Sequence, residues 1–473
     1  MPTHAGTDGD LVVRGGRVVL ESEILTADVV IQGGTVAALE SPGRATVADT
    51  VEIDASGAYV MPGGVDVHTH VGLAFGDEST RDDFESASRA AAMGGTTTFL
   101  EFSIPGKDER PLDALNRRLR ASRDVTHVDY GFHGCITRTD GEHRDDIVAM
   151  AKRGVTSIKV FTAYRDLVML ELGEIREVME AAAEAGCLVM VHAETESLVE
   201  SSLRHLSSRG LLQPRYHSQS RPPEAELDAA TSVLSLAGST GCAVYLVHVT
   251  LPRVVDAIVQ ARASGVDAFG ESCPHYLLLD ESCYTSDRPE LFVCSPPMRA
   301  PEIPRELWAR ASELSGIHSD HCCFDSAQKA KGVDDLTRIP PGLPGIETRL
   351  PVVISEALNN RMELTDVVRL CAAEPARLFG LSGKGSLLPG YDGDLVIVDP
   401  KAHTEVREGL HMTTDFSPFD GRTLKGRISM VVARGRTLLQ DDRWMDLPPE
   451  GRFLARTRRA SRVGPRQASS QTM

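Results

Sequence analysis

Short apolar and β-branched runs separated by Gly-Gly pairs occupy the N-terminal part of the chain. The runs are Leu11–Val13, Arg17–Leu20, Asp28–Ile31 and Thr35–Leu39, and the Gly pairs stand at 15–16 and 33–34. Gly pairs between such runs are typical of tight turns. The pattern therefore predicts a small antiparallel sheet with hairpin turns at both pairs.

After Met61 the pattern changes, because compact apolar runs now alternate with longer stretches of helical periodicity. We expect helices at Asp82–Met93, Glu174–Ala185 and Leu227–Leu236. Buried strands are expected at Thr97–Glu101, Val128–Phe132, Ser157–Phe161, Leu188–His192, Ala243–Val249 and Gly316–Asp320. Repeated strand–helix units indicate an α/β fold with a parallel sheet, and a strand count near eight predicts a TIM-like (β/α)8 barrel with its chemistry at the carboxyl ends of the strands.

Strand-like runs return at Asp394–Val398 and Ile428–Val432, so we expect both chain ends to build one small β-sandwich domain. The predicted division is a disordered N-terminus at 1–10, this β domain at 11–60 and 381–447, the barrel at 61–380, and a disordered basic tail at 448–473. The tail prediction rests on six Arg and no Asp, Glu or Lys between residues 451 and 473.

Composition narrows the class of function. The chain has 473 residues, 25% charged and 41% hydrophobic, which is typical of a globular protein. Its 67 acidic and 50 basic residues give a net charge of −17, which argues against a nucleic-acid partner. No apolar run approaches the roughly 18 residues of a membrane span, and the N-terminus lacks the pattern of a secretory signal. The nine Cys form no C-x-x-C pair, which indicates reduced thiols and a cytoplasmic location.

Two polar features stand in apolar runs of the predicted barrel. His68 and His70 are two residues apart, so on a strand their rings point the same way and can converge on one metal ion, although a lone pair of this kind is a weak signal. Lys159 lies in a run that otherwise predicts a buried strand. It either reaches solvent at the strand end or is a reactive amine with a lowered pKa.

Three more such side chains, His192, His248 and Asp320, each stand where an apolar run ends. A single histidine at such a place is usually a satisfied polar residue. This set, however, would converge on the opening at the carboxyl end of the barrel, because its four His, one Lys and one Asp stand at the carboxyl ends of five strands of one barrel. The joint pattern is far more specific than any of its members.

The chain resembles the amidohydrolase superfamily, in its dihydropyrimidinase and hydantoinase branch of cyclic amidases. Matching stretches run in the family's order from about residue 60 to 380, and Ala373–Ala376 and the GDLVIVD strand also fit. They are MPGGVDVHTH, AAMGGTTTFLEFSIP, SIKVFTAY, VMVHAE, SRPPEAE, YLVHVT, ESCPHYL, CSPPMR, SDHCCFDSAQKA and PGLPGIETRLP.

The resemblance implies a binuclear metal site. His68 and His70 would hold the more buried ion together with Asp320, and His192 and His248 would hold the second. Lys159 would be carboxylated by CO₂, and its carbamate would bridge both ions. Such ligands favour zinc, and they suit manganese, iron and cobalt less selectively.

The resemblance also implies a reaction, the hydrolysis of the C–N bond of a small cyclic amide or imide. A metal-bridging hydroxide would attack the carbonyl, and Asp320 would carry its proton to the departing nitrogen. Tyr164 would hydrogen-bond the oxyanion, and the backbone of Ser295 would contact the imide. From the residues alone, the alternative for Tyr164 is a barrel-rim aromatic, although the motif favours the functional role. Ser295 also fits a Ser-Pro-Pro turn, and both roles of Ser295 can hold together.

One position departs from the family pattern. Where hydantoinases have Asn in an Ile-Pro-Asn-Gly segment that helps bind the substrate amide, this chain has Pro341, which has no N–H to donate. The substrate therefore stays open. The apolar rim at Leu167–Leu170 and the Leu73–Phe75 loop suit a 5-substituted hydantoin, or they simply pack as loops.

Three neighbouring histidines and a cysteine pair are expected to be structural or to orient the ligands. These residues are His275, His318, His321, Cys322 and Cys323.

Two alternatives accompany the cyclic amidase hypothesis. Within the class, the rival is an allantoinase or another cyclic ureide or imide hydrolase. From another class, the rival is a non-catalytic scaffold of the same fold, which the complete ligand set disfavours. The resemblance further implies a homo-oligomer, either a tetramer or a dimer.

Overall fold

The computed structural model describes residues 10–457 except 46, 48, 49, 76, 77, 140, 408 and 409. Residues 1–9 of the predicted disordered N-terminus therefore lie outside the described residues, as does the stretch 458–473 of the predicted tail. None of the described helices combines the length and the apolar character that crossing a membrane requires.

Eight parallel strands form the barrel sheet, in the order β15-β14-β13-β12-β11-β10-β9-β6. An isolated parallel bridge between Thr69 and His321 links the two ends of this sheet, and the His70 N–H donates to the His321 carbonyl at 2.6 Å. The strands are β6 (Gly64–Thr69), β9 (Thr96–Ser103), β10 (Asp129–Cys135), β11 (Ser157–Phe161), β12 (Leu188–His192), β13 (Val244–Leu246), β14 (Ala268–Ser272) and β15 (Gly316–Ile317).

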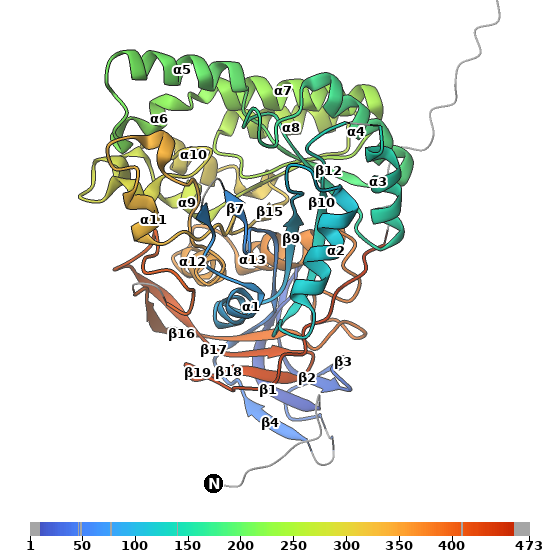
Figure 1. Cartoon of the computed structure of the whole chain (residues 1–473). Coiled ribbons are helices and arrows are strands. Elements are labelled where there is room, and N and C mark those ends of the chain that lie inside the picture. Colours follow the sequence, from blue (N-terminus) through green and yellow to red (C-terminus); the bar gives the residue numbers. More distant parts are fainter. Residues whose placement is uncertain are drawn as a thin grey trace, which may run out of the picture.

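Helices cover the outside of the barrel (Figure 1). They are α1 (Phe84–Met93), α2 (Pro111–Ser122), α3 (His143–Lys152), α4 (Leu172–Ala185), α5 (Glu196–Ser208), α6 (His217–Ser220), α7 (Pro223–Thr240), α8 (Pro252–Ala263), α9 (Pro274–Leu278), α10 (Ile303–Trp308), α11 (Ser326–Ala330), α12 (Arg349–Leu358), α13 (Leu364–Val368) and α14 (Glu374–Leu378). Short 3₁₀ turns lie at Pro214–Tyr216, Glu281–Thr285, Pro289–Phe292, Ala311–Glu313 and Leu336–Arg338, and a π-helical turn lies at Arg369–Ala373.

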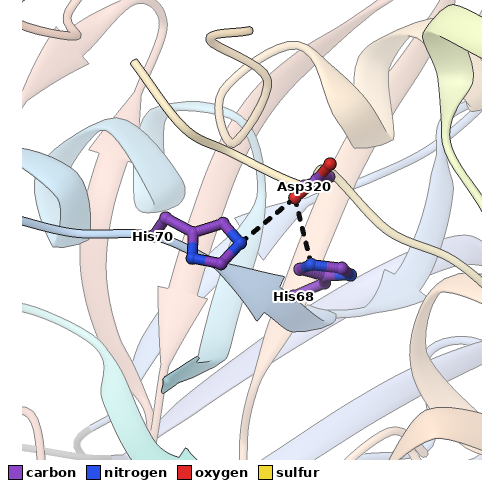
Figure 2. Close-up of side chains that lie close together, drawn as sticks. All are labelled: His68, His70 and Asp320. Atoms are coloured by element: carbon purple, nitrogen blue, oxygen red, sulfur yellow. Dashed lines mark ion pairs between the residues drawn. The ribbon is translucent and has the colours of Figure 1, made fainter. Parts of the chain in front are cut away.

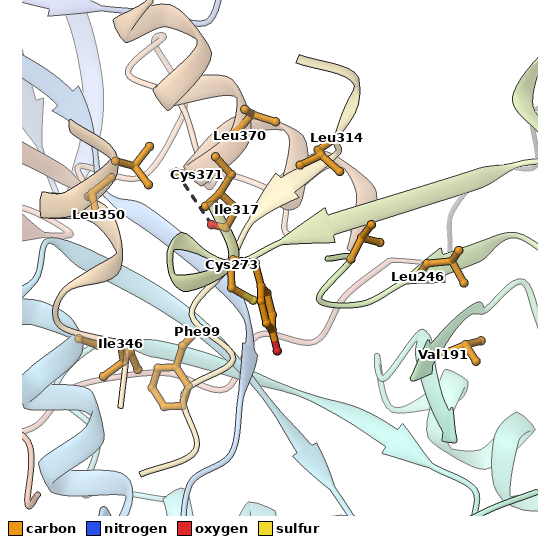
Figure 3. Packing of buried hydrophobic residues seen from close by; sticks show 14 of the residues in the cluster. Phe99, Val191, Leu246, Cys273, Leu314, Ile317, Ile346, Leu350, Leu370 and Cys371 are labelled. Carbon is orange, nitrogen blue, oxygen red and sulfur yellow. Dashed lines mark hydrogen bonds between the residues drawn. The ribbon is translucent and has the colours of Figure 1, made fainter. Parts of the chain in front are cut away.

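The main core lies between the barrel strands and these helices. Outward-facing side chains of the strands, such as Phe99 and Ile317, pack among Leu350 of α12 and Leu370 of the π-helical turn (Figure 3). A second apolar cluster, including Leu100, Phe102 and Tyr245, contributes side chains to the inside of the barrel. Because both faces of the strands are buried, several of them, such as β11, β12 and β13, are nearly continuous apolar runs.

Most of the barrel follows the prediction. The strands β11 and β12 have the predicted bounds, and the (β/α)8 architecture is confirmed. β14 was not predicted, because Gly270, Glu271 and Ser272 break its apolar run. β13 ends before the predicted Val249, since His248 has a φ of 40° and leaves the extended conformation.

The two chain ends form one nine-stranded mixed sheet, seen below the barrel in Figure 1 with blue strands beside red ones. Its order is β19-β18-β17-β16-β5-β1-β2-β3, with β4 paired to β1. The bounds are β1 (Leu11–Val19), β2 (Ile24–Gln32), β3 (Thr35–Glu40), β4 (Val51–Asp54), β5 (Tyr59–Pro62), β16 (Leu395–Glu405), β17 (Thr423–Ala433), β18 (Arg436–Gln440) and β19 (Arg443–Trp444). A two-stranded ribbon, β7 (Ala74–Phe75) with β8 (Glu78–Ser79), stands apart.

Two details of the N-terminal prediction are wrong. The sheet is not purely antiparallel, because β1 pairs in parallel with β4 and β5. The Gly pair at 15–16 is not a hairpin turn but an irregularity within β1, where the register shifts between Val13 and Gly16 and the Gly15 N–H donates to Asp28 at 2.8 Å. The pair at 33–34 does connect β2 to β3 as predicted.

Residues 451–457, assigned from the sequence to a disordered tail, pack against the barrel. Phe453 bridges to Tyr130, and the Leu454 N–H donates to the Tyr130 carbonyl at 2.7 Å. Arg456 is buried and donates to the Ser157 hydroxyl at 2.9 Å. Buried polar groups at the amino end of the barrel thus hold this segment, a long-range effect that local composition does not reveal.

Candidate metal centre

The six predicted metal ligands meet in one cavity of about 310 Å³ at the carboxyl ends of the barrel strands. His68 lies in β6 and His70 follows that strand, Lys159 lies in β11, and His192 ends β12. His248 and Asp320 follow β13 and β15 and have φ values of 40° and 47°. Such left-handed backbone is strained in residues other than Gly and is common at functional sites.

His68, His70 and Asp320 form the first cluster (Figure 2). Oδ1 of Asp320 lies 3.0 Å from Nε2 of His68 and 3.3 Å from Nε2 of His70, and one ligand atom from each residue lies within 4.8 Å of the others. On its other side His68 contacts Glu271 through Nδ1. Burial opposes ionisation of Asp320, but the adjacent histidines hold its pKa well below the ordinary value.

An unsatisfied nitrogen of this cluster fits a metal ion. Nε2 of His68 is buried and makes no hydrogen bond with any described residue, although Oδ1 of Asp320 lies 3.0 Å away, and Nε2 of His70 faces the same oxygen at 3.3 Å. Two imidazoles and a carboxylate are a donor set that zinc and related divalent ions accept.

His192 and His248 form the second cluster. Nδ1 of His192 lies 2.9 Å from Nε2 of His248, and Nε2 of His192 lies 2.8 Å from Oε2 of Glu194. Burial lowers the pKa of both histidines, so both are neutral near pH 7, the form in which imidazole binds metals. The rings of His68 and His248 are 5.5 Å apart, which brings the two clusters together.

Lys159 is only 1% exposed and lies 5.1 Å and 5.0 Å from the ring centroids of Phe102 and Phe161. Within the described part of the chain its amine makes no hydrogen bond and no ion pair. Burial lowers its pKa to about 8. Of the two interpretations of Lys159, exposure at the strand end is therefore wrong, and a buried, readily deprotonated amine is present.

Tyr164, Ser295 and Pro341 line the same cavity. Tyr164 has a φ of 69°, and its ring lies 5.3 Å from that of His192. Burial raises the pKa of its phenol to about 12, so the hydroxyl stays protonated and can donate a hydrogen bond. Beside Pro341, the Gly342 N–H already donates to the Val293 carbonyl at 3.1 Å.

Two buried carboxylates for which the sequence predicted no role contact ligand rings. Glu271 contacts His68, and Glu194 contacts His192. Glu194 had a usable signal, since it follows His192 by two residues at a strand end. Glu271 lies in the strand that was missed.

A third cluster, Asp82, His321 and Cys323, also has the composition of a metal site. Its atoms are already paired: Asp82 Oδ2 lies 3.0 Å from Nε2 of His321 and 3.0 Å from Sγ of Cys323. Nδ1 of His321 accepts the Gly345 N–H at 3.2 Å. These contacts stabilise the loop after β15.

Comparisons with known proteins agree on one family. The model of the amidohydrolase family matches residues 59–438. A D-hydantoinase of Streptomyces coelicolor is 36% identical over 94% of this chain and 97% of its own length. A D-phenylhydantoinase of Escherichia coli O1:K1 is 36% identical over 94% of this chain and 98% of its own length.

Solved structures agree as well. A dihydropyrimidinase from Brevibacillus agri superposes with a TM-score of 0.92 at 33% identity, covering 95% of this chain and 99% of that one. An L-hydantoinase from Arthrobacter aurescens superposes with a TM-score of 0.87 at 29% identity, covering 94% of this chain and 99% of that one.

Proposed function

The chain belongs to the amidohydrolase family and is a hydrolase of cyclic amides, and from this premise we propose that it opens hydantoin-like rings with two divalent ions bound in its cavity. The observation that carries the proposal is the convergence of six ligand-type side chains, from five strands, in that cavity. A non-catalytic scaffold would not need this set, so the scaffold alternative is not favoured.

His68, His70 and Asp320 would hold one ion, and His192 and His248 the other. Lys159, as a carbamate formed with CO₂, would be shared between them, which turns a costly buried amine into an anionic oxygen ligand. Zinc is the metal we propose, given imidazole and oxygen donors. The bound ions would supply hydroxide near neutral pH and polarise the scissile carbonyl.

The chain's own groups then carry the proton and the charge. Asp320 would accept the proton of the attacking water and deliver it to the ring nitrogen as the C–N bond breaks, leaving a carboxylate product. The phenolic O–H of Tyr164 would donate a hydrogen bond to the carbonyl oxygen as negative charge develops there. The Ser295 backbone would contact the imide, whereas Pro341, which lines the same cavity, offers no N–H.

For the substrate, we propose a 5-substituted hydantoin with an apolar substituent. The cavity wall is apolar at Leu73, Ile104, Leu167 and Val168. The names of the relatives, D-hydantoinase and D-phenylhydantoinase, agree with this choice. An allantoinase-like activity on a polar ureide is less well matched by these side chains.

A ring-opening assay over a panel of cyclic amides tests the substrate proposal. The panel is hydantoin, 5-benzyl- and 5-isopropylhydantoin, dihydrouracil, allantoin, dihydroorotate and succinimide. We expect the highest kcat/KM for the 5-substituted hydantoins. A preference for allantoin or dihydroorotate would overturn the substrate proposal and leave the hydrolase class intact.

Replacing Tyr164 by Phe is expected to lower kcat by about 10²–10³-fold with little change in KM, since the lost hydrogen bond strengthens only as the oxyanion forms. Steady-state kinetics on the best substrate of the panel measures this. Tyr216→Phe, outside the cavity, is the matched control. Equal rates for the two variants would contradict the role of Tyr164.

We further propose that the protein acts in the cytoplasm as a homo-oligomer. The nine cysteines all lie in the described part of the chain and form no disulfide there, which supports a reducing compartment. The oligomer, a dimer or a tetramer, rests on the family resemblance.

A further inference from the structure

Two buried arginine–glutamate pairs lie beside the His192 and His248 cluster, and the proposed function gives them no role. Arg221 pairs with Glu194, and Arg299 pairs with Glu226. Glu194 ends the stretch VHAE, Arg221 and Glu226 lie in SRPPEAE, and Arg299 ends CSPPMR. Their side chains are at most 11% exposed. Burying two ion pairs is costly unless their contacts are well made.

The first pair acts on the ring of His192. Nε of Arg221 lies 3.0 Å from both carboxylate oxygens of Glu194, and Nη2 lies 2.6 Å from Oε2. The same Oε2 lies 2.8 Å from Nε2 of His192. An ionised carboxylate there accepts the Nε2–H, which leaves the Nδ1 lone pair facing His248. The pair thus sets both the tautomer and the angle of the ring.

The same guanidinium also contacts Tyr164. The Cζ atom of Arg221 lies 5.2 Å from the centroid of the Tyr164 ring, which is cation–π distance. The Tyr164 ring in turn lies 5.3 Å from that of His192. One arginine therefore holds two side chains of the site in their relative positions.

The second pair holds the backbone around the first. Nη1 of Arg299 donates to the Arg221 carbonyl at 2.6 Å, and Nη2 lies 2.9 Å from Oε2 of Glu226. Oε1 of Glu226 accepts the Thr250 N–H at 2.8 Å. Thr250 follows His248 by two residues, so this pair joins Arg221 to the segment that carries the second histidine.

We propose that Arg221 is a positioning residue that orients His192 for the second metal ion and holds Tyr164 beside it, an inference that rests on the proposed function. Without Arg221, Glu194 would lose the guanidinium that fixes the position of its carboxylate. His192 would then lose the fixed acceptor that sets its tautomer.

The test measures metal binding, not only activity. Metal-stripped wild type, Arg221→Met, Glu194→Gln and the double variant are titrated with zinc by equilibrium dialysis and with cobalt by absorbance. We expect affinity for one ion to fall about 10–100-fold in each single variant while the other ion binds as in wild type. The double variant should bind no more weakly than the weaker single variant, since both changes act through one ring.

Arg434→Met is the matched control. The Arg434 side chain is only 12% exposed and pairs with a buried carboxylate, Asp129, at the amino end of β10. In the described part of the chain, Asp129 also accepts from Lys384 and from the Arg452 N–H, and none of these residues lies next to a proposed metal ligand. Arg434→Met should lower the Tm and leave the affinity for both ions unchanged.

The outcomes separate the two proposals. A wild-type protein that takes up fewer than two ions would overturn the proposed function and this inference with it. If wild type binds two ions and Arg221→Met and Glu194→Gln bind both with wild-type affinity, only the inference is overturned. Should Arg221→Met not fold, the nearly isosteric Glu194→Gln decides alone.

Discussion

Replacing Asp320 by Asn is expected to lower kcat for ring opening by at least about 10³-fold. Oδ1 of Asp320 lies 3.0 Å and 3.3 Å from the Nε2 atoms of His68 and His70, and the pKa of its carboxyl is well below the ordinary value. An amide of the same shape carries no charge for a metal ion and takes up no proton at neutral pH. Both proposed roles of Asp320 are lost together.

Kinetics and zinc analysis of the same Asp320→Asn sample measure this. The control is Asp228→Asn on α7, where an exposed carboxylate accepts the Thr195 hydroxyl at 2.7 Å. Its rate should equal that of wild type. A kcat for Asp320→Asn within tenfold of wild type would contradict the assignment of Asp320.

Replacing Lys159 by Met is expected to have two effects of opposite sign. The rate of ring opening falls by at least about 10³-fold, because the shared oxygen ligand can no longer form. The metal-free protein, by contrast, becomes more stable below pH 8. The folded chain holds Lys159 with a pKa of about 8 against an ordinary 10.5, so it binds this proton less tightly than the unfolded chain.

The size and pH window of the gain follow from those two pKa values. Removing Lys159 raises the free energy of unfolding by about 3 kcal/mol below pH 8, and this gain disappears as the pH rises towards 10.5. Denaturant unfolding of the stripped proteins at pH 7 and pH 10 measures it.

Lys384→Met is the matched control for the stability effect. Lys384 is equally buried, but its amine lies 2.6 Å from Asp129 and 2.8 Å from both Asp392 and Asp394. The same substitution there leaves the buried carboxylate of Asp394 without a cation among the described residues and should destabilise the fold by about 3–5 kcal/mol. If Lys159→Met were destabilising to the same degree, the unpaired state of Lys159 would be contradicted.

Much of the barrel could be predicted because apolar runs in the sequence coincide there with strands that are buried in the fold. Strands buried on both faces favour apolar runs, and β11 and β12, which are apolar over most of their length, were found to the residue for that reason. β14 was missed because Glu271 sits in its run, and a buried carboxylate makes sense only with His68 in contact, 203 residues away. The strand end at His248 depends on a backbone angle with no local sequence signal.

The candidate site could be located for a related reason. Parallel strands bring their carboxyl ends to one edge, so polar residues that end apolar runs converge without any knowledge of their contacts. The contacts that hold these polar residues in position could not be predicted. The contacts of Arg221 with Glu194 and of Arg299 with Arg221 join residues 27 and 78 positions apart through side chains of loops. Residues 451–457 illustrate the same limit in the fold.

The most direct test of metal-dependent ring opening is the rate of 5-benzylhydantoin hydrolysis by metal-stripped protein as zinc is restored in the presence of bicarbonate. We predict that stripping abolishes turnover and that the rate rises with added zinc to a plateau at two ions per chain. Full turnover by the stripped protein, or no turnover of any ring in the panel with two zinc ions bound per chain, would contradict the proposed function.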